Sequence, residues 1–189
     1  MTDAIQENRL ALSLPPQQVC RIAEEMHSRG MQEEACSLLS LLGGTDTPET
    51  ADTLQRMAND AARPALQAGA ACALLRRAGL PQPEEYAVET WLENHPAAAA
   101  RPAVQTALLL TSTVSLWAGE MSPQEQQDLL QAMRDIGAAE AAERYEAIIK
   151  ALDNPEALDE LESGDPSWKF RLKARIGEFI LRNAAEFGN

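Results

Sequence analysis

Aromatic side chains are scarce in this sequence: Phe, Tyr and Trp together make up 4% of its 189 residues. Segments that alternate Val, Ile, Thr or Tyr with polar residues, as half-buried strands do, are also missing. The 45% of residues that are hydrophobic consist largely of Ala, Leu and Met, which favour helices. These absences predict an all-α protein whose core is built from small and aliphatic side chains.

Cysteine and histidine are too few for the common catalytic and metal sites. Cys20, Cys36 and Cys72 form no C-x-x-C pair, and an odd number argues against a disulfide framework. Cys20 and His27 can share a helix face, but over a nucleophile pair we favour a Cys20 that packs inward and a His27 that lies beside the turn at Gly30. His95 has no neighbouring ligand, and neither a nucleophile elbow nor a phosphate loop occurs. We therefore predict no catalytic residue, no metal and no cofactor; an enzyme with an unrecognised site is the third class of function.

Positively charged residues are few: the sequence contains 16 Lys and Arg residues and 29 Asp and Glu residues, which gives a net charge of −13. Such a surface repels nucleic-acid backbones and anionic membranes. We expect the partner to be another protein, with no direct nucleic-acid or membrane binding. Residues 165–189 are an exception to this acidic balance, because they contain five basic and three acidic residues. A basic last helix can close against the acidic remainder or offer a second surface.

The longest uncharged run covers residues 102–119, and it is too short and too rich in Thr and Ser for a transmembrane helix. Its first half, rich in Ala and Leu, favours a helix over a strand. We expect the central helix of a packed helical protein, because two apolar stripes place neighbours on both sides. The stripes are Val104, Ala107, Leu108 and Thr111 on one side, and Leu110, Val114 and Trp117 on the other. The first residues lack the features of a secretory signal, so we expect a cytoplasmic protein.

Proline and glycine divide the chain into units. Five prolines, 32 to 40 residues apart, stand at or near the start of apolar-periodic segments: Pro16, Pro48, Pro83, Pro123 and Pro155. A second breaker inside most units, such as Gly30 or Gly137, separates two helices. The prediction is a single all-helical domain, residues 1–189, with hairpins at about 15–44, 47–80, 82–120 and 122–154 and a terminal helix at about 165–187. Each hairpin must stack on a neighbour to bury its apolar stripe, in a regular helical repeat or an irregular bundle.

Helix caps and one helix face are also readable. Thr47 is expected to cap a helix, and Ser122 with Glu125 forms a capping box. Asp165 and Pro166 are expected to open the last helix. Its apolar face gathers Trp168, Leu172, Ile176, Phe179, Ile180 and Phe187. A face with so many large apolar residues favours a helix that caps the stack over one that serves as a docking arm for a partner.

Three stretches resemble known bacterial helical families. Residues 16–43 resemble one tetratricopeptide-type hairpin, with Ala23, Gly30 and Ala35 in the expected places of the stretch RIAEEMHSRGMQEEACSLLSLL. Such hairpins in small acidic proteins are similar to the chaperones and adaptors of protein-secretion systems. The stretch AVETWLENHPAAAARPAVQTA, followed by SLWAGEMSP, resembles an uncharacterised helical family and implies no activity. LLQAMRDIGAAEAAERYEAII with IGEFILRNAAEF is similar to a family that includes an acidic DNA mimic, although that family's Asn-Gly-Gly-aromatic motif is absent.

The sequence thus predicts a non-enzymatic adaptor or chaperone that binds another protein, of the kind that serves bacterial secretion. A groove between stacked hairpins would receive a helix or an extended segment of the partner. Trp91 and Trp117 are the expected apolar anchors, and Glu84 and Glu85 the expected acidic rim. The alternative is an acidic nucleic-acid mimic that occupies the basic site of a DNA-binding protein. The partner's identity is left open, and so is a homodimer.

Overall fold

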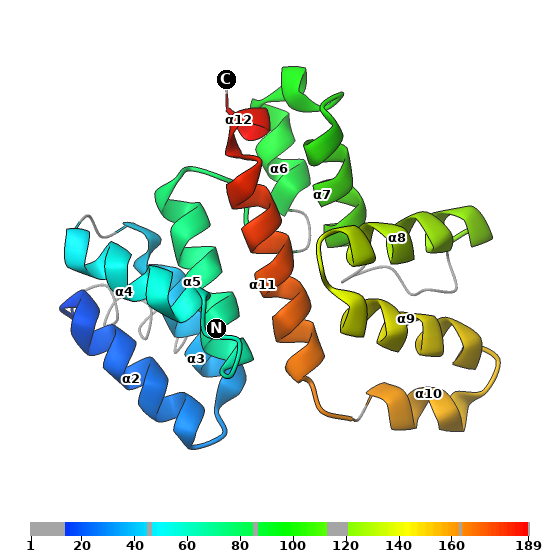
Figure 1. Cartoon of the computed structure of the whole chain (residues 1–189), viewed down its shortest axis with the longest axis horizontal. Helices are drawn as coiled ribbons and strands as arrows, with labels where there is room; N and C mark the ends of the chain where they lie inside the picture. Colours follow the sequence, from blue (N-terminus) through cyan, green and yellow to red (C-terminus); the bar gives the residue numbers. More distant parts are fainter. Residues whose placement is uncertain (1–13, 45–46, 85–86, 113–120, 163, 189) are drawn as a thin grey trace. The chain divides into compact units, whose positions relative to one another are not determined.

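The computed structural model describes residues 14–44, 47–84, 87–112, 121–162 and 164–188. Within these ranges the chain forms eleven α-helices and no strand (Figure 1), which confirms the predicted all-α fold class. The stacking of the hairpins stays a prediction.

The chain forms two compact units, residues 1–82 and 83–189. Residues within a unit pack mainly against other residues of the same unit. The proline and glycine pattern predicted a single domain over residues 1–189, and that domain count stays a prediction.

The first unit is built around one helix that is rich in small residues. Its elements are α2 (Pro16–Ser28), α3 (Gln32–Ser40), η1 (Leu41–Gly44), α4 (Pro48–Ala58) and α5 (Pro64–Arg77). Helix α5 contacts α2, α3, η1 and α4, and ten of its fourteen residues are buried. Leu39 and Leu54, both fully buried, belong with Leu66 of α5 to one apolar core. Small side chains on α5 let the surrounding helices approach it closely.

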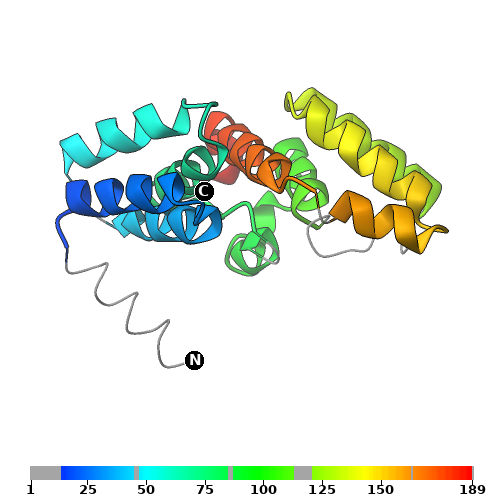
Figure 2. The ribbon, with the colours of Figure 1, turned by 90° about the horizontal axis from the view of Figure 1, so that it is seen from below.

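The second unit contains the remaining helices. Its elements are α6 (Ala87–Asn94), η2 (Pro96–Ala98), α7 (Pro102–Ser112), α8 (Pro123–Asp135), α9 (Ala139–Ala151), α10 (Pro155–Glu162), α11 (Ser167–Arg182) and α12 (Ala184–Phe187). Helices α8 and α9 form a hairpin and lie side by side (Figure 2). Helix α11 contacts α7, α9 and α12.

Helix α7 covers the described part of the helix that was expected to be central. It contacts α6, α8, α11 and α12, and it buries Val104, Ala107, Leu110 and Thr111 on one face. The assignment of Leu108 to this face was wrong, because Leu108 is only half-buried and Leu110 takes its place. At 3.6 residues per turn, Leu108 points about 100° away from the centre of the buried face. Leu110 was predicted in a second stripe with Val114 and Trp117, but it lies on the buried face of the first stripe; Val114 and Trp117 lie outside the described residues.

Proline and glycine mark the helix ends much as expected. Proline is the first residue of six helices: Pro16, Pro48, Pro64, Pro102, Pro123 and Pro155. Pro83 stands near α6, whose described residues begin at Ala87. Gly30 after α2 and Gly137 after α8 have φ of +84° and +79°, a conformation that costs little only for glycine. The residue after each glycine donates its amide back to the helix, Met31 to Met26 O at 3.0 Å and Ala138 to Met133 O at 2.8 Å.

The predicted caps are present. The amide of Thr50 donates to Thr47 Oγ1 at 3.4 Å at the start of α4. At α8 the Glu125 amide donates to Ser122 Oγ at 3.3 Å, and the Ser122 amide donates to Glu125 Oε2 at 2.7 Å. These reciprocal bonds confirm the capping box. Asp165 accepts from the Ser167 amide at 3.0 Å and so opens α11, as predicted.

The C-terminal helices pack against the other helices of the second unit. Leu172, Ile176 and Ile180 of α11 are buried, and Phe187 of α12 is 2% exposed. Trp168 and Phe179, at the edge of the same face, are half-buried. This burial confirms that the apolar face of the last helix is covered.

Basic residues of α11 bind acidic residues of the same unit. Arg171 donates to both carboxylate oxygens of Glu140 on α9, at 2.5 and 2.6 Å. Lys173 Nζ lies 2.8 Å from Glu84 Oε1. These ion pairs join α11 to acidic residues of its own unit; a partner-binding surface on this helix stays a prediction.

Candidate protein-binding groove

A polar groove of about 680 Å³ lies between α2 and α4 in the first unit. We call it the α2–α4 groove. The turn between α4 and α5 also contributes to its lining. Ten residues line it: Gln17, Cys20, Arg21 and Glu24 from α2, Thr53, Arg56 and Met57 from α4, and Asn59, Asp60 and Arg63 from the turn. Such a lining is more polar than that of a typical small-molecule pocket, which is largely apolar.

The spacing of residues along α2 explains how one face of this helix lines the groove while a neighbouring face packs in the core. Its lining residues lie at spacings of three, four and seven from Gln17, so they share one face. Val19 and Ala23, on the neighbouring face, are fully buried in the core. Cys20 lies at the boundary between these faces and is 4% exposed. Together with Met57 of α4, at 5%, it forms an apolar floor.

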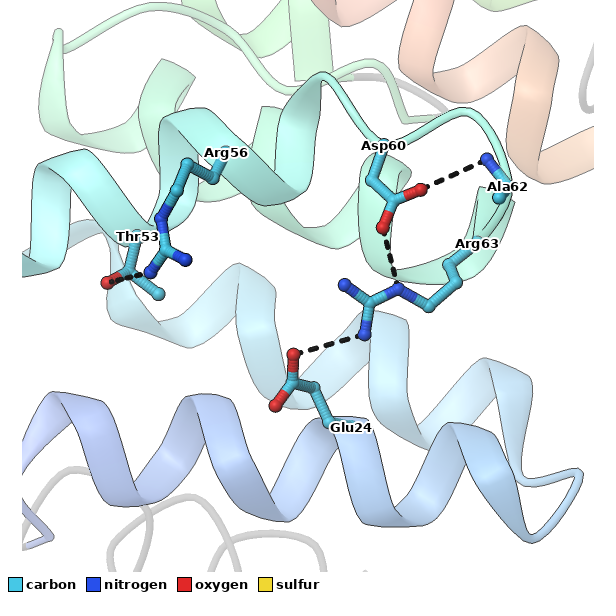
Figure 3. A network of polar contacts seen from close by, with 6 residues as sticks. All are labelled: Glu24, Thr53, Arg56, Asp60, Ala62 and Arg63. Carbon is cyan, nitrogen blue, oxygen red and sulfur yellow. Dashed lines mark hydrogen bonds and ion pairs between the residues drawn. The ribbon is translucent and has the colours of Figure 1, made fainter.

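Arg63 binds two carboxylates, that of Asp60 in the same turn and that of Glu24 on α2 (Figure 3). Its Nη1 lies 3.0 Å from Glu24 Oε1, and its Nε lies 2.7 Å from Asp60 Oδ2. The other oxygen of Asp60 accepts from the Ala62 amide at 3.1 Å. The hydrogen bond from Arg63, aided by that amide, lowers the pKa of Asp60 below its ordinary value of 3.8. Both acidic residues of the groove are therefore engaged by one arginine.

Arg56 and Arg21 are the other two arginines of the groove, and both are exposed. Arg56 donates to Thr53 Oγ1 at 3.3 Å, a neutral acceptor on its own helix (Figure 3). Within the described ranges neither Arg56 nor Arg21 takes part in an ion pair. The groove thus carries two guanidinium groups that form no ion pair with a described carboxylate.

Cys20 is a structural thiol in this setting. Burial, and then the negative charge of Glu24, raise the pKa of Cys20 above its ordinary value of 9.0. A thiol in that state is protonated at neutral pH and is a poor nucleophile. His27, which was weighed as its partner, does not line the groove. The buried-thiol interpretation of Cys20 is supported.

The predicted site residues lie in the second unit, outside the lining of this groove. The ring of Trp91 stacks on His95 at 4.1 Å between centroids and lies 5.5 Å from the ring of Phe187. It is half-buried. Glu84 is exposed but holds Lys173. The structure therefore shows Trp91 and Glu84 in contacts within the chain.

The other two predicted site residues, Trp117 and Glu85, lie outside the described residues. A binding role for all four residues stays a prediction.

The arginines of the groove were not among the predicted site residues. Arg21 and Arg56 lie on different helices, and no sequence pattern shows that those helices become neighbours. One usable signal was present: residues 17, 21 and 24 form a polar stripe on a helix whose other face is apolar.

Metal-ligating residues are not clustered in the described part of the chain, which contains no group of three or more His, Cys, Asp or Glu residues placed to hold a metal ion. Among the helices of these same ranges, none combines the length and the apolar character needed to cross a membrane.

No protein-family model matches this chain, and comparisons with curated proteins and with solved structures gave no match. The likeness of residues 16–43 to a tetratricopeptide-type hairpin, and the two other resemblances, therefore stay expectations.

Proposed function

We propose that this chain is a non-enzymatic, cytoplasmic adaptor or chaperone that binds another protein, of the kind that serves bacterial secretion. The α2–α4 groove carries this proposal. It is long enough to draw lining residues from two helices and a turn, and its rim is exposed while its floor is apolar. Grooves between helices that combine apolar anchors with charged rims receive helices or extended segments of other proteins.

The proposed binding surface differs from the one that the sequence predicted. The predicted anchor Trp91 is packed against His95 and Phe187, whereas the α2–α4 groove lies open beside α2. The exposed side chains of the groove, Gln17, Arg21 and Arg56, are accessible to a partner without any change in packing.

Photocrosslinking in the native host tests the proposal. A photoreactive amino acid replaces Gln17, which is exposed and lines the groove, or its exposed neighbour Gln18, which does not. Successive residues on a helix point about 100° apart, so Gln18 is a matched control. We expect a discrete protein adduct at position 17 and none at position 18. Equal adducts at both positions, or none at either, would refute a partner in this groove.

One observation favours the acidic-mimic alternative. The second unit carries 19 acidic residues against 9 basic ones, a net charge of −10, whereas the first unit carries 10 against 7, a net charge of −3. A mimic of nucleic acid would therefore act through the second unit, and its partner would be a basic DNA-binding protein. Crosslinking from exposed positions of α8 or α10, rather than from Gln17, would support this alternative.

A further inference from the structure

The charges of the α2–α4 groove are unusual for this chain. The protein as a whole is strongly acidic, yet three arginines and only two carboxylates line this groove. Arg63 takes up both carboxylates, Glu24 at 3.0 Å and Asp60 at 2.7 Å. The lining therefore carries a net charge of +1, and Arg21 and Arg56 are its two arginines that form no ion pair with a described carboxylate.

These two arginines come from opposite sides of the groove. Arg21 belongs to α2 and Arg56 to α4, and the buried side chains of Cys20 and Met57 lie on the floor. A guanidinium group is a planar fork of donors that fits a carboxylate with two parallel hydrogen bonds. Two such forks above an apolar floor suit a segment that presents carboxylates beside small apolar groups.

Amide side chains add donors and acceptors for a peptide backbone. Gln17 on α2 and Asn59 after α4 line the same groove and are exposed. Each carries an NH2 group and a carbonyl oxygen, which can pair with the peptide groups of an extended segment. A compact anion would not use these groups.

We propose that the α2–α4 groove binds an acidic segment of a protein partner, whose carboxylates pair with Arg21 and Arg56. This inference rests on the proposed function and adds the chemistry of the partner. Long polyanions such as nucleic acids are disfavoured, since they would extend over a protein of net charge −13.

A nitrogen-15 NMR titration of the full-length protein tests this inference. The probe is a capped peptide of eight residues that alternates Glu with Ala, and its counterpart replaces each Glu by Gln. Substitutions Arg21→Lys and Arg56→Lys assign the arginine Nε signals. We expect the Nε signals of Arg21 and Arg56 to move saturably with the Glu peptide alone. The Gln peptide should bind at least about tenfold more weakly, a loss of about 1.4 kcal/mol.

Variants complete the experiment. The double variant R21A/R56A should weaken binding of the Glu peptide at least about tenfold. R76A removes an exposed arginine of the same unit that does not line the groove, and it should bind like the wild type. Far-ultraviolet circular dichroism and thermal melting confirm that each variant is folded, which is expected because the replaced side chains are exposed.

Several outcomes would overturn the inference. They are equal binding of the two peptides, no saturable shift at millimolar peptide, and displacement of the Glu peptide by inorganic phosphate or a short oligonucleotide. A crosslink at position 17 without Glu-peptide binding would leave the proposed function standing and remove its acidic partner. Glu-peptide binding without any crosslink would show that the groove accepts acidic peptides, but it would remove the proposed protein partner in the native host.

Discussion

At Gly69 the backbone of α5 lies directly against α3. A methyl group at this position would lie 2.6 Å from the carbonyl oxygen of Cys36 and 2.9 Å from Cβ of Leu39. The nearest atom belongs to backbone, which cannot rotate away as the end of a side chain can. Glycine is required here by the distance between two helices.

We therefore expect Gly69→Ala to destabilise the protein. Alanine normally stabilises a helix interior by about 1 kcal/mol relative to glycine. Overpacking a close contact costs about 1–3 kcal/mol of stability. We expect a cost near the upper value here, because the clashing atom belongs to the backbone. Urea unfolding should show a lower free energy of unfolding for the variant. A variant more stable than the wild type would show that α3 moves away without loss.

Asp60 should make the stability of the first unit sensitive to acid. Its pKa is lower in the folded protein than its ordinary 3.8, because Arg63 and a backbone amide bind the charged form. The stabilisation is present above the ordinary pKa of 3.8 and is lost as the pH falls through the folded-state pKa. Asp60→Asn should therefore flatten the decline in stability below about pH 4.

Thermal melting at a series of pH values measures this effect. Asp52→Asn, an exposed position of α4, is the control with the same change of chemistry. If the curves of wild type and D60N stay parallel down to about pH 2, the bond to Arg63 makes no net contribution.

Single helices are the scale at which the sequence predicted most. Proline at the first position and glycine after the last are local signals, and they correctly marked helices such as α2 and α8. The face of a helix was harder to predict. The apolar pattern of α7 allowed either Leu108 or Leu110 in the buried stripe, and only its neighbours decide in favour of Leu110.

Helix α12 is a short element whose position depends on distant residues. Arg101 Nη1 donates to the backbone oxygens of Glu186 and Gly188 at 2.7 and 2.6 Å. The carboxylate of Glu186 accepts from the amide of Ala103 at the start of α7, at 2.9 Å. Phe187 is thereby held beside Trp91. The sequence predicted an apolar role for Phe187 but gave no sign of this contact, because the two rings lie far apart along the chain.

Phe187→Ala should therefore affect both stability and the surroundings of Trp91. Removing a buried phenyl group costs about 3–5 kcal/mol where the site cannot collapse. Loss of the ring also admits water to Trp91, so the tryptophan emission should shift to longer wavelength. Denaturant unfolding and fluorescence measure the two effects. The spectrum of a W91F variant identifies the contribution of Trp91, and an unchanged emission in F187A would mean that α12 does not cover it.

Across the whole molecule, the pairing of helices is what local patterns leave open. Which helices become neighbours depends on chain reversal over tens of residues, and for that reason the sequence did not predict the α2–α4 groove. The division of the net charge between the two units likewise cannot be predicted until the boundary between the units is known. The first unit holds −3 of the net charge and the second −10.

The two units should also be distinguishable in unfolding. Each has its own buried residues, such as Leu66 in the first unit and Leu110 in the second, and each could lose its packing separately. We expect differential scanning calorimetry to resolve two transitions.

Two variants assign the transitions to the units. Gly69→Ala should lower the midpoint of one transition, and Leu110→Ala the midpoint of the other. Leu110 is fully buried, so its truncation should cost about 2–5 kcal/mol and give a clear shift. Because each variant serves as the control for the other, the result does not depend on which transition comes first. One transition that both variants lower equally would instead mean that residues 1–189 unfold as the single domain that the sequence pattern predicted.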